Sequence, residues 1–511
     1  MAQANAPPTI PQFFHGRTLF ITGATGFMGK VLLSKLMRCC PGIANIYVLI
    51  RPHSGKTAAS RLQEILALPL FDSVREHAAS QLDKLIAVEG DITQLRLGLS
   101  SDHYLAITSS VSVVFHVAAS VRFNESLSDA VLKNTRGTRE VVNLCLGMKQ
   151  LVALLHVSTT YSNCERKVVD ELVYSSPVSW QDTIQVTENL DPAIVNIFGT
   201  KYIGNKPNTY TFTKCLAEHI IWDHRNRLPV IIFRPSIVVS TWKDPIPGWI
   251  DNLNGPVGMM MGSGTGVLRV SMCDPDVVPD YMPVDIAIRA ILVAVYKKGI
   301  SREQESEEFV FNCASTSSSI SNGALIEMGL NMVKDVPLTN AIWVTSDETT
   351  TSKTYFTIKS WFAHLLPAVF VDMALRISGH EPRLVKIQRK IFIAISALSY
   401  FTCQEWKFKN EKFMRLLTYI LPEDKEDFDF DFSDIDPVTY FRQCVLGARI
   451  YLLHDPVENI PAGKRRAKRL YWIHKAVTIS FVLLLIWILD FPFILHQLRA
   501  SLHYQNSTVI L

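Results

Sequence analysis

Short apolar segments alternate with amphipathic ones through the first half of the chain. The apolar segments lie at 17–22, 45–50, 84–91, 111–118, 151–159 and 228–235. Segments with apolar residues at helical spacing separate them, including a long one at 126–148. Short buried strands that alternate with helices are typical of βαβ units, in which helices cover both faces of a parallel sheet. The pattern therefore predicts an α/β fold with a doubly wound parallel sheet.

The alternation stops near residue 350, and helical patterns follow. Two apolar segments there, at 363–375 and 391–401, are shorter than a membrane span and favour buried or interfacial helices. An acidic run at 423–436 interrupts the helical patterns. It lacks the glycine that a calcium-binding EF-hand loop needs, so we expect a solvated loop whose phenylalanines point inward. The pattern predicts a second, mostly helical domain.

The last apolar segment, residues 476–495, has the length of a transmembrane helix and one charge, Asp490, near its end. Basic residues gather before it, and only Arg499 follows it; those before it are Lys464, Arg465, Arg466, Lys468, Arg469 and Lys475. Positive charge favours the cytosolic side of a membrane. We therefore expect a single C-terminal span in membrane lipid, with the preceding domains in the cytosol. Asp490 and Pro492 leave a hairpin or an interfacial helix as alternatives.

Composition argues against several classes of protein. Of the 511 residues, 48% are hydrophobic and 19% are charged, which is typical of a folded chain. The net charge of +4 is small for a nucleic-acid-binding protein. The nine cysteines include no Cys-x-x-Cys, so neither a disulfide framework nor a metal site is expected. Residues 1–14 lack the features of a signal peptide and are expected to form a flexible arm. The sequence does not reveal the oligomeric state.

The segment TGATGFMG, residues 22–29, follows the first predicted strand and opens a helix. Its glycines, Gly23, Gly26 and Gly29, are spaced three apart, as in extended short-chain dehydrogenases. Glycine permits a tight turn with positive φ and a close approach of the backbone to a pyrophosphate, which the N-terminus of the helix attracts. We predict that these glycines bind a dinucleotide cofactor together with Thr25, Phe27 and Met28.

The residue that closes the second strand, Arg51, bears on the identity of the cofactor. An acidic residue there would bind the ribose 2′-OH of NAD, whereas a guanidinium suits the 2′-phosphate of NADPH. We therefore expect NADPH, although an arginine that only caps a surface strand is the alternative. Asp91 and Ile92, at the end of the third strand, are expected beside the adenine. Ala118 and Ala119 are expected beside the middle of the cofactor.

A tyrosine followed four residues later by a lysine occurs four times, at Tyr202–Lys206, Tyr210–Lys214, Tyr355–Lys359 and Tyr471–Lys475. A reductase must protonate the alkoxide that hydride attack produces, and a lysine one helical turn away is expected to lower the pKa of such a tyrosine. Only Tyr210–Lys214 falls on a helix between two core strands. The other pairs precede a proline, follow the sheet or adjoin the C-terminal span. We therefore predict that Tyr210 and Lys214 are catalytic.

The order of these motifs resembles an extended short-chain dehydrogenase over residues 15–340. More specifically, TGATGFMGKVLLSKLMR, YVLIRP, FHVAASVRFNESL, HVSTTYSNC, YTFTK and PDYMPVD resemble the N-terminal domain of the fatty acyl-CoA reductases. The segment EDFDFDFSDIDPVTYFRQCVLGARIYLLHDP resembles the helical C-terminal domain of that family. The resemblance implies a Rossmann-type NADPH-binding domain at 15–350, a helical domain at 351–462, and a juxtamembrane segment and anchor at 463–511.

The resemblance also assigns roles to residues of the strand ends. The hydroxyl that orients the substrate carbonyl is expected at Thr159, with Ser158 as the alternative, because Thr160 replaces an alanine that many members of the family have. Pro235 and Ile237, in the segment RPSIV, complete the expected cofactor contacts together with Lys214.

The activity that the resemblance implies is reduction of a long-chain fatty acyl-CoA by NADPH. Two hydride transfers, through an aldehyde, would give a primary alcohol for wax or ether-lipid metabolism, at the endoplasmic reticulum or the peroxisome. Three alternatives stay open. The first is a membrane-bound reductase of a sterol or steroid, the second is a reductase that stops at the aldehyde, and the third is a tethered binding protein without catalytic activity.

Overall fold

The computed structural model describes residues 7–301, 308–315 and 320–507, and side chains as far as residue 488. A seven-stranded parallel sheet forms its centre, in the order β11-β7-β5-β4-β1-β2-β3. These strands are β1 (Thr18–Thr22), β2 (Asn45–Ile50), β3 (Leu85–Glu89), β4 (Val111–His116), β5 (Ala153–Val157), β7 (Val230–Pro235) and β11 (Val310–Cys313). The predicted α/β fold is confirmed, and β11 is a strand that the sequence pattern did not identify.

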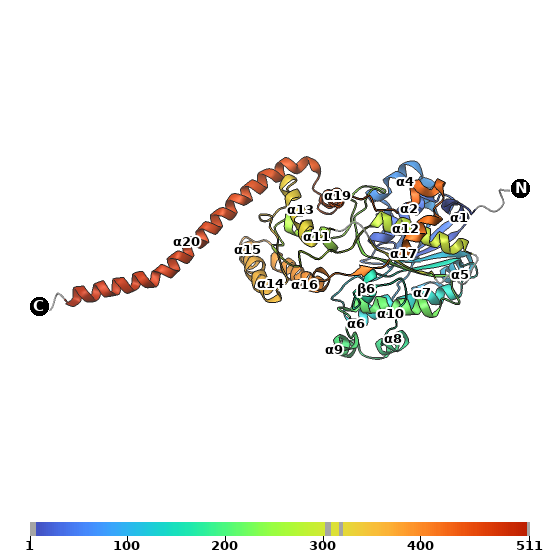
Figure 1. Cartoon of the computed structure of the whole chain (residues 1–511), viewed down its shortest axis with the longest axis horizontal. Coiled ribbons are helices and arrows are strands. Elements are labelled where there is room, and N and C mark those ends of the chain that lie inside the picture. Colours follow the sequence, from blue (N-terminus) through green and yellow to red (C-terminus); the bar gives the residue numbers. More distant parts are fainter. Residues whose placement is uncertain (1–6, 302–307, 316–319, 508–511) are drawn as a thin grey trace.

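Helices cover both faces of the sheet (Figure 1). Alternate residues of β1 point to opposite faces, so Leu19 packs in one core with α2 (Phe27–Cys39) and α12 (Val284–Ile300). Phe20 packs in the other core with α7 (Gly137–Leu146) and α10 (Thr209–Asp223). The helix predicted at 126–148 comprises α6 (Leu127–Ala130), the π-helical stretch η4 (Val131–Arg136) and α7. The order of the strands reverses between β1 and β4, and a crevice is expected at that point.

The remaining elements lie around this layered body. They are α1 (Ile10–Phe14), α3 (Ala58–Leu66), α4 (Asp72–His77), α5 (Ser101–Ser110), β6 (Val168–Val169), α8 (Trp180–Asn189), α9 (Pro192–Tyr202), β8 (Ile237–Val239), α11 (Gly255–Gly264), β9 (Val270–Met272), β10 (Tyr281–Pro283), α13 (Asn322–Asp335) and β12 (Glu348–Thr350). The expected flexible arm needs a correction at its end, because residues 10–14 form α1. Ile10 and Phe14 are fully buried, and Thr9 caps the helix. Residues 1–6 lie outside the described part.

The C-terminal part is mostly helical and packs against the sheet domain. It contains α14 (Lys353–Ser360), η6 (Trp361–Leu365), α15 (Leu366–Ile377), α16 (Leu384–Thr402), β13 (Lys407–Phe408), α17 (Glu411–Arg415), α18 (Lys425–Phe428), α19 (Pro437–Gly447) and α20 (Ile460–Ser507). Strand β13 pairs with β6 of the first part. The acidic run places Phe428, Phe430 and Phe432 in the same core as α2 and α12, so the prediction of inward phenylalanines is confirmed.

In the part of the chain that the structure describes, two helices are long and apolar enough to cross a membrane, residues 353–377 and 457–488. The second contains the start of the predicted span, and α20 continues through all of 476–495. The first corrects one of the two expectations for its segment, a buried helix, whereas the interfacial helix stays a prediction. The apolar segment 363–375 is part of one helical rod of 25 residues, and most of its apolar side chains are exposed rather than buried. The described residues therefore contain two candidate spans where the sequence pattern suggested one.

The buried phenylalanines generate a prediction about stability. Phe430 is fully buried, and its ring centroid lies 5.1 Å from that of Phe413. Phe430→Ala leaves a cavity between α12 and α17, and we expect it to lower the free energy of unfolding by about 3–5 kcal/mol. Denaturant unfolding of the full chain in detergent measures this change. Asp434→Ala in the same loop removes an exposed side chain and should leave the midpoint nearly unchanged. Equal midpoints for both variants would contradict the assigned packing.

Candidate active site

A cavity of about 1860 Å³ opens at the carboxyl ends of the central strands. Its lining includes every predicted cofactor residue: Gly23, Thr25, Gly26, Phe27, Met28, Gly29, Arg51, Asp91, Ile92, Ala118, Ala119, Lys214, Pro235 and Ile237. Thr159, Ser158 and Tyr210 line the same cavity. These residues come from segments far apart in the chain, and the parallel sheet brings them together because the carboxyl ends of its strands share one edge.

The glycine turn lies directly against the end of β4. Gly23 has a φ of +79°, and a Cβ placed on it would lie 2.4 Å from the Ala118 nitrogen. A Cβ on Gly29 would lie 2.3 Å from the Gly23 oxygen, so the turn and α2 are also in contact. Gly26 is the N-cap of α2 and supplies no side-chain cap. The first N–H groups of this helix therefore face the cavity, which is the arrangement that binds a pyrophosphate.

Two guanidinium groups lie at the end of the cavity next to β2 and β3. Arg51 is largely exposed, and its Nη1 lies 3.6 Å from Oδ2 of Asp91. Arg61 of α3 also lines the cavity and donates a hydrogen bond to the Arg51 carbonyl. Sequence reasoning missed Arg61, because only the return of α3 over the end of β2 brings it near. Asp91 also accepts hydrogen bonds from the backbone N–H and the hydroxyl of Thr93, at 2.9 and 2.8 Å.

Tyr210 and Lys214 lie on α10, where Asn208 caps the helix by accepting the Thr211 N–H at 2.9 Å. Loss of hydration raises the pKa of Tyr210 to about 12, and a hydrogen bond with Thr159 opposes that rise. Loss of hydration lowers the pKa of Lys214 to about 7, and the charge of Glu218 opposes that fall. The expected lowering of the Tyr210 pKa needs a correction, because loss of hydration raises this pKa by more than the hydrogen bond with Thr159 lowers it. A tyrosine with a raised pKa stays protonated, which is the form that donates a proton.

The two hydroxyls considered for the carbonyl occupy different environments. Thr159 lies beside Tyr210 and accepts the Tyr161 N–H at 3.3 Å. Ser158 instead donates a hydrogen bond to Oε1 of Glu218 at 2.5 Å. The Thr159 hydroxyl therefore lies next to Tyr210, whereas the Ser158 hydroxyl is used in a hydrogen bond with Glu218 inside the protein.

Glu218 of α10 and Arg234 of β7 form a buried ion pair at 2.7 Å. Glu218 also accepts the hydroxyl of Ser162 at 2.9 Å, and Arg234 donates to the carbonyl of Leu172 at 2.8 Å. The pair thus ties α10, the loop after β5 and strand β7 to one another. Sequence reasoning missed it, although a glutamate one turn after Lys214 on the same helix is the signal that could have found it.

The other three tyrosine–lysine pairs lie outside the cavity. Lys206 binds Glu165 and the Ser162 carbonyl. Lys359 donates to the hydroxyl of Tyr355 at 3.2 Å, and this pair is exposed on α14. Tyr471 and Lys475 lie on α20. The order of motifs along the chain therefore predicted correctly which pair faces the cavity.

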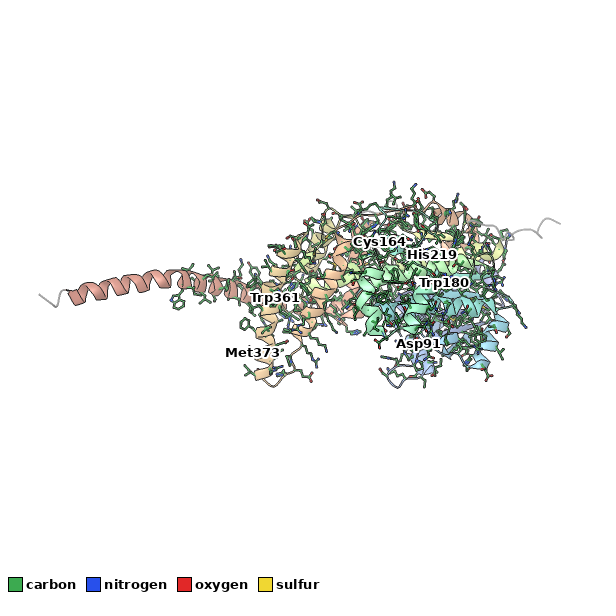
Figure 2. The ribbon with its side chains drawn as sticks, turned by 90° about the horizontal axis from the view of Figure 1, so that it is seen from below. Asp91, Cys164, Trp180, His219, Trp361 and Met373 are labelled. Carbon is green, nitrogen blue, oxygen red and sulfur yellow. The ribbon has the colours of Figure 1, made fainter. Side chains whose placement is uncertain are left out.

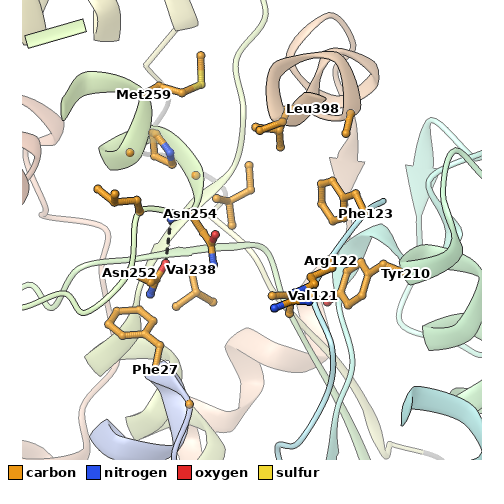
Figure 3. Close-up of a pocket in the computed structure, with 18 of the residues that line it drawn as sticks. Phe27, Val121, Arg122, Phe123, Tyr210, Val238, Asn252, Asn254, Met259 and Leu398 are labelled. Carbon is orange, nitrogen blue, oxygen red and sulfur yellow. Dashed lines mark hydrogen bonds between the residues drawn. The ribbon is translucent and has the colours of Figure 1, made fainter. Parts of the chain in front are cut away.

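The cavity continues from Tyr210 into an apolar region that the sequence did not reveal. Figure 3 shows Tyr210 beside Phe123, with Phe27 across the cavity and Met259 and Leu398 farther along it. The ring centroids of Phe123 and Tyr210 lie 5.7 Å apart. Further lining comes from the apolar side chains of α11 and α16, among them Met260, Met261, Ile391, Ile395 and Phe401. An apolar wall of this kind suits an apolar ligand. Among the described residues, no group of His, Cys, Asp or Glu is arranged to hold a metal ion.

The turn that contains Gly23, Gly26 and Gly29 is called the glycine cradle below. Together with the doubly wound sheet and helix α10, which carries Tyr210 and Lys214, it defines a Rossmann-type oxidoreductase that uses a nicotinamide cofactor. Two family models, both described as "Male sterility protein", match residues 21–291 and 363–455, and the first is an NAD-binding model. The chain is 36% identical to fatty acyl-CoA reductase 1 of Xenopus laevis and of Homo sapiens, over 94% of this chain and 93% of each relative. It is 35% identical to fatty acyl-CoA reductase 2 of Mus musculus. The chain belongs to the fatty acyl-CoA reductase family.

Solved structures show the same fold at low identity. The terminal R domain from the myxalamid PKS-NRPS biosynthetic pathway aligns with a TM-score of 0.55 and 18% identity, covering 88% of this chain and 93% of that domain. The reductase domain of a nonribosomal peptide synthetase from Mycobacterium tuberculosis aligns with a TM-score of 0.54 and 18% identity, covering 88% of this chain and 94% of that domain. The central sheet and much of the chain around it are therefore shared with reductase domains.

The cradle generates a prediction about cofactor affinity. A Cβ on Gly26 would meet only the Gly23 oxygen, at 3.2 Å, so Gly26→Ala should fold and place its methyl group where the phosphates bind. Loss of one or two charge-assisted hydrogen bonds should raise the Kd for a nicotinamide dinucleotide by about 10–100-fold. Cofactor fluorescence titration measures this Kd. Gly147→Ala adds the same methyl group at contacts of 3.4 Å, outside the cavity, and serves as the control. An unchanged Kd for Gly26→Ala would exclude the cradle.

Proposed function

We propose that this protein reduces long-chain fatty acyl-CoA to the primary alcohol, with NADPH as the reductant. The observation that carries the proposal is the continuity of a single cavity, which joins the glycine cradle, Tyr210 and the apolar wall of α11 and α16. A cofactor in the cradle and an acyl chain along the wall would meet at Tyr210. The relatives named fatty acyl-CoA reductase support the choice of substrate.

The side chains around Tyr210 have complementary roles in this reaction. When bound, the nicotinamide supplies the hydride that adds to the thioester carbonyl. The hydroxyls of Thr159 and Tyr210 hold the carbonyl oxygen, and Tyr210 gives its proton to the oxygen as negative charge develops. Lys214, whose Nζ donates to the Val157 carbonyl at 2.7 Å, lies one helical turn after Tyr210, and its protonated form would favour the tyrosinate that forms.

The first reduction leaves a hemithioacetal, which loses CoA as a thiol and becomes the aldehyde. The same site then reduces the aldehyde, and Tyr210 protonates the resulting alkoxide to give the alcohol. Acyl-CoA, two NADPH and two protons thus give the alcohol, CoA and two NADP⁺. The apolar wall retains the aldehyde between the two steps, because a long chain loses the free energy of apolar burial on leaving.

NADPH is proposed over NADH because two arginines lie at the end of the cavity where the adenosine ribose is expected. A 2′-phosphate would bind between Arg51 and Arg61, whereas a bare hydroxyl would offer the two guanidinium groups no charge-assisted hydrogen bond.

The proposal extends to the arrangement of the chain at a membrane. Residues 15–350 form the NADPH-binding domain and 351–462 the helical domain, which contains the whole of the second family match, 363–455. Helix α20 anchors the protein in lipid through 476–495, with the site in the cytosol, at the endoplasmic reticulum or the peroxisome. The basic residues that begin α20 support this orientation.

Removal of the proton donor tests the reaction. Tyr210→Phe keeps the ring and deletes the hydroxyl, so kcat for NADPH oxidation with palmitoyl-CoA should fall by about 10²–10⁴-fold while NADPH still binds. Tyr355→Phe removes the hydroxyl of an exposed tyrosine–lysine pair and should keep full activity. Chromatography of the products distinguishes alcohol from aldehyde. Full activity of Tyr210→Phe would overturn the assignment, and accumulation of aldehyde would show an enzyme that stops after one reduction.

Removal of the arginine charge tests the cofactor preference. Arg51→Ala should raise the KM for NADPH about tenfold, because one charge-assisted contact to the 2′-phosphate is lost, and should leave kcat/KM with NADH nearly unchanged. Steady-state kinetics with both cofactors measures the ratio. Arg227→Ala, an exposed arginine outside the cavity, is the matched control. An equal effect on both cofactors would argue against a 2′-phosphate site at Arg51.

A further inference from the structure

The helical rod at residues 353–377 and the following helix α16 form an apolar hairpin beside the cavity. The rod turns one stripe of side chains to the protein, and its members recur every four residues: Phe356, Ser360, His364, Ala368 and Asp372. Nε2 of His364 accepts the Arg269 N–H at 2.9 Å, and the ring of Phe356 stacks on that of Phe392 in α16 at 5.4 Å. This stripe holds the rod along the side of the protein.

The opposite side of the rod carries large apolar side chains in water-accessible positions. Phe362 is 68% exposed, Phe370 62% and Ile377 82%. The whole stripe comprises Ile358, Phe362, Leu366, Val369, Phe370, Met373 and Ile377, with Trp361 at its side. Spacings of three and four residues place these on one face of a helix. An exposed apolar stripe of this length marks a binding surface.

The turn of the hairpin is fixed by a single carboxylate. Asp372 accepts the backbone N–H groups of Arg383, Leu384 and Val385 at 2.9–3.0 Å, so it caps α16 from the neighbouring helix. The N-cap residue of α16, Arg383, makes no side-chain cap of its own. The apolar stripe is therefore presented on a rigid support.

Basic side chains surround the tip of the hairpin. The exposed basic residues there are Arg376, Arg383, Lys386, Arg389 and Lys390, against one exposed acidic residue, Glu381. An apolar helical face bordered by lysine and arginine is the composition of helices that lie in the interface of an anionic membrane.

The hairpin and α20 project from the same end of the molecule. Figure 1 shows α14, α15 and α16 at the end from which α20 extends, away from the central sheet. Figure 2, seen from a perpendicular direction, places Trp361 and Met373 at that end as well. The start of α20 is held to the body, because Nε of Arg466 donates to the Ala341 carbonyl at 2.7 Å.

The cavity reaches this hairpin. Ile387 and Lys390, exposed on α16, line it together with Ile391, Ala394 and Leu398 farther along the same helix. Helix α16 therefore has one side toward the apolar part of the cavity and packs against the buried stripe of the rod, through Phe392 on Phe356 and through the Asp372 cap.

We propose that the apolar hairpin docks in one leaflet of the membrane that holds α20, lying in the interface rather than crossing it, and that acyl chains enter the cavity from this leaflet along α16. Crossing would require the stripe from Phe356 to Asp372 to leave its contacts with the protein. The docking follows from the surface alone. The entry of acyl chains rests on the proposed function.

Fluorescence quenching tests the docking without turnover. The full chain with Cys403→Ser, which leaves eight buried cysteines, is placed in vesicles of phosphatidylcholine and phosphatidylserine. A fluorophore on Phe370→Cys should be quenched by lipids brominated in the acyl chain and protected from iodide. A fluorophore on Ile197→Cys, 80% exposed on α9, should show the reverse. Iodide quenching at 370 equal to that at 197 would show that the stripe faces water, and no quenching at 370 by either agent would show that protein covers it; each result would overturn the docking.

The depth of the rod separates docking from crossing. Labels on Ile358→Cys and Ile377→Cys, near its two ends, should report similar depths with lipids brominated at different carbons. Labels that report opposite leaflets would show a second span and overturn the proposal.

The entry route has its own test. Phe362→Ser with Phe370→Ser changes only exposed residues outside the cavity and should lower kcat/KM for a long-chain acyl-CoA held in vesicles about tenfold, because two rings no longer partition into lipid. A short-chain acyl-CoA in water should react as before. Ile194→Ser with Ile197→Ser is the matched control. Equal loss on both substrates would overturn the route. Absence of turnover by the unsubstituted protein would contradict the proposed function and leave the quenching result standing.

Discussion

The buried ion pair between Glu218 and Arg234 is the constraint on which the arrangement of α10, the loop after β5 and strand β7 depends. Two opposite charges with no exposed surface are stable only when paired and hydrogen-bonded, and removal of one partner from such a pair costs about 3–5 kcal/mol. The pair satisfies this requirement by binding the loop after β5, strand β7 and the segment at 170–172 at once. Thr159 lies in the loop after β5, and Tyr210 lies on α10 together with Glu218, so their relative position is set by an interaction that neither of them makes.

The turn between β1 and α2 depends on a different constraint, because its glycines carry no side chain. Gly23 and Gly29 bring the first turn, the start of α2 and the end of β4 closer together than any Cβ would allow. This turn lies where the strand order reverses between β1 and β4. The shared strand edge therefore brings the glycine turn and Tyr210 into one cavity, with helices and strands of the central body on both sides.

The C-terminal part completes the site instead of forming an independent body. Its phenylalanines, from Phe413 to Phe432, fill the core under α2 and α12, and α16 supplies one wall of the cavity. The same hairpin presents an apolar stripe outward. The hairpin therefore joins the cavity at Tyr210, which α16 lines, to the exposed apolar surface of the rod.

Local sequence was sufficient for features that depend on neighbouring residues. The alternation of apolar and amphipathic segments predicted six of the central strands, the spacing of Gly23, Gly26 and Gly29 predicted the cradle, and the position of Tyr210 between two strands separated it from three similar pairs. Long-range features needed the tertiary structure. Arg61, the Glu218–Arg234 pair and the wall of α11 and α16 come together only when distant segments pack, and the raised pKa of Tyr210 depends on how much water that packing excludes. The burial of residues 10–14 and the exposure of 363–375 were decided in the same way, because periodicity shows that a helix has an apolar face but not what that face contacts.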